Sequence, residues 1–161
     1  MHPDGKVESY DKRHSFTLAN EHKTYTSGSS KLIVEYKGWK ICPLICYDLR
    51  FPVWSRNTEN YDLLIYTANW PKKRVYAWDS LLKARAIENL SYTIGVNRVG
   101  EDGKSYNYVG HSIALDFLGK PMSESNCSSE KIIEVSLDKS LQSKQRKRYG
   151  FLNDKDVFSI E

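Results

Sequence analysis

The sequence is poor in cysteine and has no long apolar run. Its three cysteines in 161 residues are an odd number, which does not indicate a disulfide framework and is typical of a reducing compartment. No apolar stretch comes near the ~20 residues that a membrane-spanning helix needs. The polar residues 1–14 lack the apolar core of a signal peptide. We therefore expect a cytoplasmic protein without a membrane partner.

The sequence also lacks the ligand spacing of a metal site. Cys42 and Cys46 form a C-x3-C pattern with no second pair, whereas a structural zinc site needs four well-spaced ligands. We therefore expect no metal. Cys42 and Cys127 lie in no further motif, and we expect them to be structural residues.

Positive charge is in small excess, with a formal net charge of +4. Its most visible source is the run KQRKR at residues 144–148. A basic run can mark a nucleic-acid contact, but no aromatic platform, zinc-knuckle spacing or recognition-helix pattern accompanies it. We interpret it as a solvated helix end, where cations are favoured near the negative pole of the helix dipole. No nucleic-acid partner is expected.

The apolar content is sufficient for one folded domain. Hydrophobic residues make up 40% of the chain and aromatic residues 12%, and the length fits a single domain over residues 1–161. Apolar runs alternate with helical patterns, which predicts an α/β layered fold. Strands are expected at 32–36, 39–46, 61–69, 91–97, 111–117 and 131–137, and helices at 51–58, 74–90 and 138–148.

Local signals refine this pattern. The Lys37-Gly38 pair predicts a tight hairpin between the first two strands. Pro43 inside the second run argues for an edge position or a bulge, and Pro52 suits the first turn of a short helix. Residues 3–11 resemble a strand and turn.

The segment 74–90 is predicted to be an amphipathic helix, because its apolar residues recur at helical spacing. These residues are Val75, Trp78, Leu81, Leu82 and Ile87.

A cysteine stands where an apolar run stops. Inert core packing is the plain interpretation of Cys46, since cysteine is among the most buried residue types. However, Tyr47 and Asp48 follow at once, and amides exposed at such a turn can form an oxyanion hole beside a nucleophile. A thiol becomes reactive only if a base or a cation favours its thiolate. The upstream polar loop 11–28 supplies candidates, namely Lys12, His14, Glu21 and His22.

A second polar segment, residues 67–74, begins where the run 61–69 ends. That is the edge of a sheet at which α/β folds usually bind ligands.

Together these segments resemble the nitrilase, or carbon–nitrogen hydrolase, family and its ω-amidase-like branch. The resemblance runs through nearly the whole chain. It rests on YDKRHSF (10–16), NEHKTYTSG (20–28), ICYDLRFP (45–52), ANWP (68–71), LLKARAIEN (81–89), GVNRVGEDG (95–103), GHS (110–112) and FLND (151–154). It implies an αββα sandwich that pairs with a second subunit into a homodimer, and an enzyme without cofactor or metal.

The resemblance also implies roles for particular residues. Cys46 would be the nucleophile that forms a thioester with a small ω-amide such as 2-oxoglutaramate. Lys12 would stabilise the oxyanion together with the backbone N–H of Tyr47, as a tetrahedral intermediate requires. Glu21 matches a supporting glutamate that orients the lysine or the substrate. Asn69, Trp70 and Pro71 would line the pocket.

The sequence departs from the family pattern at its start. The family's general-base glutamate lies far ahead of the lysine, whereas Lys12 is close to the first residue. We therefore expect a sandwich incomplete at the N-terminus, a partial domain without amidase activity of its own. The alternative to an amidase is a non-catalytic remnant or an interaction module. Smaller departures are Ser15, Val53 and Gly150, where leucine, glutamate and proline are usual.

Overall fold

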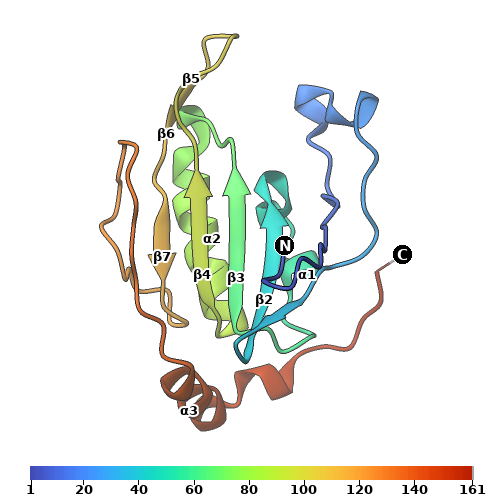
Figure 1. Ribbon diagram of the computed structural model, residues 1–161, viewed down its shortest axis with the longest axis vertical. Helices are drawn as coiled ribbons and strands as arrows, with labels where there is room; N and C mark the ends of the chain where they lie inside the picture. The colour runs from blue at the N-terminus through green and yellow to red at the C-terminus, as the bar shows by residue number, and fades with distance from the viewer. Residues whose placement is uncertain (161) are drawn as a thin grey trace.

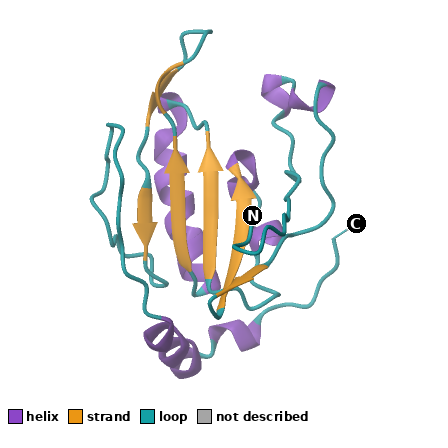
Figure 2. Ribbon diagram, viewed as in Figure 1, coloured by secondary structure: helices purple, strands orange, loops and turns teal. Residues whose placement is uncertain are grey.

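The computed structural model describes residues 1–160. Within these residues the main sheet has five strands in the order β1-β2-β3-β4-β7, with helices on one face (Figures 1 and 2). The α/β class predicted from the alternating pattern is confirmed. The strands are β1 (Val34–Tyr36), β2 (Trp39–Ile45), β3 (Leu63–Ala68), β4 (Tyr92–Asn97) and β7 (Ile113–Leu115).

The three central strands run parallel, and the outer strands β1 and β7 run antiparallel to their neighbours. The carboxyl ends of β2, β3 and β4 therefore meet at one edge of the sheet, the upper edge in Figure 1. A separate hairpin of β5 (Val99–Glu101) and β6 (Asn107–Val109) rises beyond this edge.

The first hairpin has the predicted turn. Lys37 and Gly38 connect β1 to β2 with φ of 47° and 78°, the left-handed pair that a tight hairpin turn requires. The prediction for Pro43 is partly right. β2 is an inner strand, but β1 pairs only with residues 39–41, so β3 alone pairs with β2 at Pro43.

The helices are α1 (Pro52–Ser55), α2 (Val75–Asn89) and α3 (Lys139–Tyr149). Short 3-10 segments also occur: η1 (Thr17–Ala19), η2 (Glu21–Lys23), η3 (Cys46–Arg50), η4 (Lys72–Arg74) and η5 (Phe151–Asp154). α1 begins at Pro52, as predicted, because proline at the first position gives up an N–H that has no helical partner.

α2 covers the sheet through a buried stripe that contains Trp78, Leu82 and Ala86. The predicted helix is confirmed, but the prediction of its buried face is wrong at one residue. Ile87 is 52% exposed, whereas Arg85 and Asn89 are buried. Both side chains bind distant partners, since Arg85 donates to Leu49 O and Asn89 Oδ1 accepts from Asn57 N–H.

The opposite face of the sheet carries a second apolar cluster. Leu63, Tyr92 and Phe117 are buried there, with Ile65 and Leu137 packed against them.

Two predicted strands are wrong. Residues 131–137 form no strand, and Ile132 is 89% exposed. The outer edge of β7 is already taken, because Met122 N–H donates to Ala114 O at 2.8 Å, so the later segment finds no free strand there. The opening residues 3–11 contain a turn but no strand.

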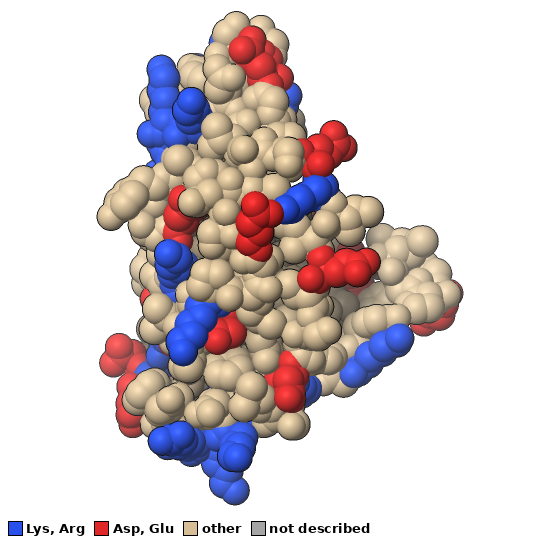
Figure 3. All heavy atoms as spheres, turned by 90° about the vertical axis from the view of Figure 1, so that its left-hand side faces the viewer, with Lys and Arg blue, Asp and Glu red and all other residues tan. Residues whose placement is uncertain are grey.

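The closing helix is confirmed as α3, capped by Asp138, whose side chain accepts from Leu141 N–H. Basic side chains gather at the lower end of the molecule in Figure 3, where α3 lies in Figure 1. The prediction that this run is fully solvated is wrong at Arg146. Its guanidinium donates to the carbonyls of Leu90 and Tyr61 at 2.8 and 2.7 Å.

Candidate active site

An open cavity of about 1380 Å³ lies at the carboxyl ends of the parallel strands. Its floor comes from the residues that follow β2, β3 and β4, which is where parallel sheets usually bind ligands. The loop of residues 10–26 forms one wall, and the β5–β6 hairpin forms the other. Every residue to which the family resemblance gives a role lines this cavity: Lys12, Glu21, Cys46, Tyr47, Asn69, Trp70 and Pro71.

Cys46 occupies a strained turn directly after β2. Its φ is 47°, in the left-handed region, and such a conformation in a non-glycine residue costs on the order of 1–3 kcal/mol. It opens the short 3-10 segment η3. Cys46 lines the cavity and also packs against the edge of the core, whereas Cys42 is fully buried.

The surroundings of Cys46 shift the pKa of its thiol in opposite directions. Burial raises the pKa of its thiol, while the Lys12 ammonium and a backbone hydrogen bond at Asn69 act to lower it. For Cys42, the Lys31 ammonium acts to lower the pKa, but burial dominates and raises the pKa of its thiol to about 12. The pKa of the Cys46 thiol is raised overall, and Lys12 and Asn69 are the neighbours that favour its charged form.

Lys12 and Glu21 form an ion pair in the wall of the cavity. Lys12 Nζ lies 2.5 Å from a carboxylate oxygen of Glu21, and the two side chains are 17% and 29% exposed. The same oxygen accepts from the backbone N–H of Phe16 at 2.8 Å. Glu21 therefore holds the ammonium in place. The other candidates in this loop, His14 and His22, are not among the residues that line the cavity.

The segment after β3 forms the floor of the cavity. Trp70 is buried, and its backbone N–H donates to Asn97 Oδ1 at 2.7 Å. The Asn97 amide donates in turn to the carbonyls of Trp70 and Gly110. The ends of β3 and β4 are therefore tied together beneath the cavity.

The cavity also contains basic residues that the sequence pattern did not single out. Arg50, Arg74 and Arg98 line it. Their guanidinium groups lie over the rings of Trp70, Phe16 and Tyr108, at 4.9, 5.1 and 4.8 Å from the respective ring centres. Arg50 belongs to the ICYDLRFP motif, Arg98 to GVNRVGEDG and Arg74 to the polar segment 67–74, but no role was assigned to any of them.

No group of three His, Cys, Asp or Glu side chains within residues 1–160 is placed to hold a metal ion. Over the same residues, no helix is both long and apolar enough to cross a membrane.

Comparison with known proteins gives consistent matches. The carbon–nitrogen hydrolase family model matches residues 1–147. The chain is 44% identical over 160 residues to the omega-amidase YafV of Yersinia enterocolitica, covering 99% of this chain and 62% of the relative. It is 34% identical over 156 residues to the 2-oxoglutaramate amidase of Bacillus subtilis, covering 94% and 60%.

Among solved structures, one match is a CN-hydrolase superfamily protein from Xanthomonas campestris with an arsenic adduct in its active site. The TM-score is 0.95 at 44% identity, with 99% of this chain and 63% of the other covered. The fold class expected from the resemblance, the α/β fold of the nitrilase superfamily, is confirmed by this match. The chain spans about 60% of the length of the relatives described here.

Proposed function

The chain belongs to the carbon–nitrogen hydrolase family, and from this premise we propose that it carries the chemistry of an amidase that hydrolyses a small ω-amide. The observation that carries the proposal is the strained turn of Cys46 in a cavity shared with the Lys12–Glu21 pair. The omega-amidase and 2-oxoglutaramate amidase names of the relatives support the reaction class.

In the proposed reaction, the Cys46 thiolate attacks the amide carbonyl. A C–S bond forms, the C–N bond breaks, and the nitrogen leaves as ammonia after taking up a proton. Water then cleaves the thioester to the carboxylic acid and restores the thiol. The oxyanion of each tetrahedral intermediate would lie against the Lys12 ammonium and the backbone N–H of Tyr47, the fixed charges that such an intermediate needs.

Proton transfer in this scheme needs a general base. The family pattern assigns that role to a glutamate ahead of the lysine. Glu21 is the carboxylate that pairs with Lys12, and we propose that it orients the ammonium. Glu21 is also the first residue to test as a base if the chain is active by itself.

Three arginines that line the cavity favour an amide substrate whose far end carries a carboxylate. Arg50, Arg74 and Arg98 all line the space around Cys46, and guanidinium groups bind carboxylates through paired hydrogen bonds. 2-Oxoglutaramate and succinamate have the required form. We also propose a single domain over residues 1–161, a homodimer and a cytoplasmic location.

The test is ammonia release from 2-oxoglutaramate and succinamate, with mass spectrometry of the protein to detect an acyl group on Cys46. Turnover that depends on Cys46 supports the amidase. A folded, monodisperse chain with neither turnover nor adduct would support the alternative, a non-catalytic interaction module. The expectation that the chain alone is inactive stays a prediction, and the same assay tests it.

A further inference from the structure

A buried carboxylate lies just behind the nucleophile turn. Asp48 is 0% exposed and belongs to the same 3-10 segment as Cys46. Its two oxygens accept four hydrogen bonds. One oxygen accepts from the backbone N–H of Ile45 at 3.1 Å and from the Tyr10 hydroxyl at 2.8 Å. The other accepts from the backbone N–H and the ring Nδ1 of His14 at 3.0 and 2.9 Å.

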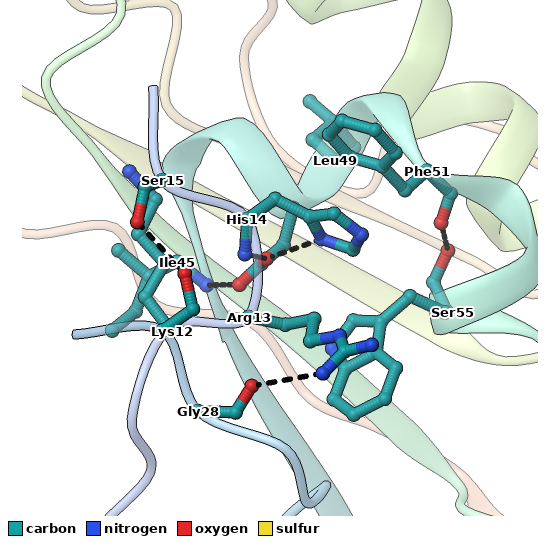
Figure 4. A network of polar contacts seen from close by, with 12 residues as sticks. Lys12, Arg13, His14, Ser15, Gly28, Ile45, Leu49, Phe51 and Ser55 are labelled. Carbon is teal, nitrogen blue, oxygen red and sulfur yellow. Dashed lines mark hydrogen bonds and ion pairs between the residues drawn. The ribbon is translucent and has the colours of Figure 1, made fainter. Parts of the chain in front are cut away.

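These partners come from two separate parts of the chain. Ile45 precedes the nucleophile, whereas Tyr10 and His14 stand on either side of Lys12. Figure 4 shows Lys12, His14 and Ile45 gathered around these contacts. The carboxylate therefore joins the strand end that presents Cys46 to the loop that presents Lys12.

Further contacts fix the loop end of this connection. The Tyr10 hydroxyl accepts from Trp54 Nε1 at 2.9 Å, and burial, followed by the charge of Asp48, raises the pKa of Tyr10, so its hydroxyl stays protonated and donates. The ring of His14 stacks on Phe51, with ring centres 3.6 Å apart and an angle of 2° between the planes.

We propose that Asp48 is a positioning residue that holds the Lys12 ammonium in register with the Cys46 sulfur. The inference rests on the proposed function, in which Lys12 and Cys46 are the reacting groups. Asp48 does not line the cavity as described, so it acts through Lys12 and not on the substrate.

The four contacts require a carboxylate. All four groups donate, and an asparagine offers only one acceptor oxygen beside an amide group that is itself a donor. In Asp48→Asn, one pair of donors would face the new N–H groups inside a buried site. The loop would shift to relieve this conflict, and a misplacement of about 1 Å can cost roughly 10²-fold in rate.

The first experiment compares Asp48→Asn with Asp62→Asn. Asp62 is a matched control, because it is also buried and accepts from a backbone N–H, that of Lys40, but at the opposite end of the sheet. We expect Asp48→Asn to lower kcat by about 10²-fold with little change in KM. It should also slow alkylation of Cys46 by iodoacetamide. Asp62→Asn should lower thermal stability and leave kcat and the alkylation rate unchanged.

The second experiment asks whether Asp48 acts through Lys12. In the Lys12→Gln background, Asp48→Asn should have no further effect on Cys46 alkylation, because coupled residues are not additive. A merely structural role would lower the rate by the same factor in both backgrounds. Additive effects, or an Asp48→Asn variant with full kcat and alkylation, would overturn the proposal.

Tyr10→Phe covers the case in which Asp48→Asn does not fold. It removes one of the four donors and should show the same coupling to Lys12 with a smaller loss. Alkylation does not depend on any amide being a substrate. If the unaltered protein shows neither ammonia release nor an acyl group on Cys46, the proposed function fails, while the coupling between Asp48, Lys12 and the thiol is still measured.

Discussion

The position of a cysteine along the chain decides whether its thiol is buried in the core or lines the cavity, as Cys42 and Cys46 show. Both belong to the segment formed by β2 and the turn after it, yet Cys42 is fully buried in the core and Cys46 lines the cavity. Burial raises the pKa of Cys42 to about 12, which makes its thiol inert near neutral pH. Burial also raises the pKa of Cys46, but the Lys12 ammonium and a backbone hydrogen bond at Asn69 act against this effect.

We expect Cys46→Ser to abolish amide hydrolysis and to leave the fold intact, because a hydroxyl without a strong base is a weak nucleophile. Cys42→Ser is the matched control. It should cost about 1–3 kcal/mol in the free energy of unfolding, since it buries a hydroxyl, and should keep the turnover number. Ammonia release and urea denaturation measure the two effects. Equal loss of activity in both variants would mean that Cys46 is not the nucleophile.

Lys12 is expected to affect both the thiol and the oxyanion. Removing one oxyanion donor costs ~10²–10³ in turnover, so Lys12→Gln should lower kcat by at least this factor. Because the ammonium acts to lower the pKa of Cys46, its loss raises that pKa. The pH profile of Cys46 alkylation should therefore move to higher pH.

Lys23→Gln serves as the control for Lys12→Gln, because Lys23 lies in the same loop and does not line the cavity as described. Its kcat and its alkylation profile should match those of the unaltered protein. An unchanged profile in Lys12→Gln would mean that Lys12 has no influence on the thiol.

At the scale of elements, the packing of α2 on β4 depends on a glycine. A Cβ at Gly95 would lie 2.5 Å from Leu82 Cδ1 and 2.7 Å from Trp78 Cζ2, both in side chains buried in the core. These distances are too short for any carbon pair, and the buried neighbours have little room to move. The absence of a side chain therefore lets the helix approach the sheet.

Gly95→Ala should lower the free energy of unfolding by about 1–3 kcal/mol, the usual cost of overpacking a core. Gly103→Ala is the control, because a Cβ there meets nothing within 4 Å. Urea denaturation of both variants measures the difference. A Gly95→Ala variant as stable as Gly103→Ala would show that the helix can shift away at no cost.

At the scale of the whole molecule, α3 ties the C-terminal part of the chain to the lower end of the sheet (Figure 1). Gln142 is fully buried and donates to the carbonyls of Asp62 and Leu90. Arg146 donates to the carbonyls of Leu90 and Tyr61 and pairs with Asp62 at 3.4 Å. These contacts satisfy carbonyl groups where β3 and β4 begin.

Arg146→Ala should lower the free energy of unfolding by about 2 kcal/mol or more, because hydrogen bonds to charged groups contribute about 1.5–3 kcal/mol each. Lys147→Ala changes an exposed neighbour in the same basic run and should stay within about 0.5 kcal/mol. Chemical denaturation distinguishes them. Equal effects would mean that the run acts only through its charge.

Local chemistry was sufficient to predict the backbone of several elements. The Lys37-Gly38 turn, the start of α1 at Pro52 and the course of β3 and β4 follow from φ preferences and apolar periodicity over a few residues. The candidate site was also largely predictable, because its residues lie in short motifs and parallel strands bring their carboxyl ends to one edge.

The tertiary structure decided which polar groups are buried. Arg85, Arg146 and Asp48 resemble surface residues in the sequence, and each forms hydrogen bonds with partners far away along the chain. Residues 131–137 have a strand-like sequence but find the edge of β7 occupied by residue 122. Local sequence sets the conformations a segment prefers. Burial of a charge or pairing of a strand depends on a partner that only the complete fold brings within reach.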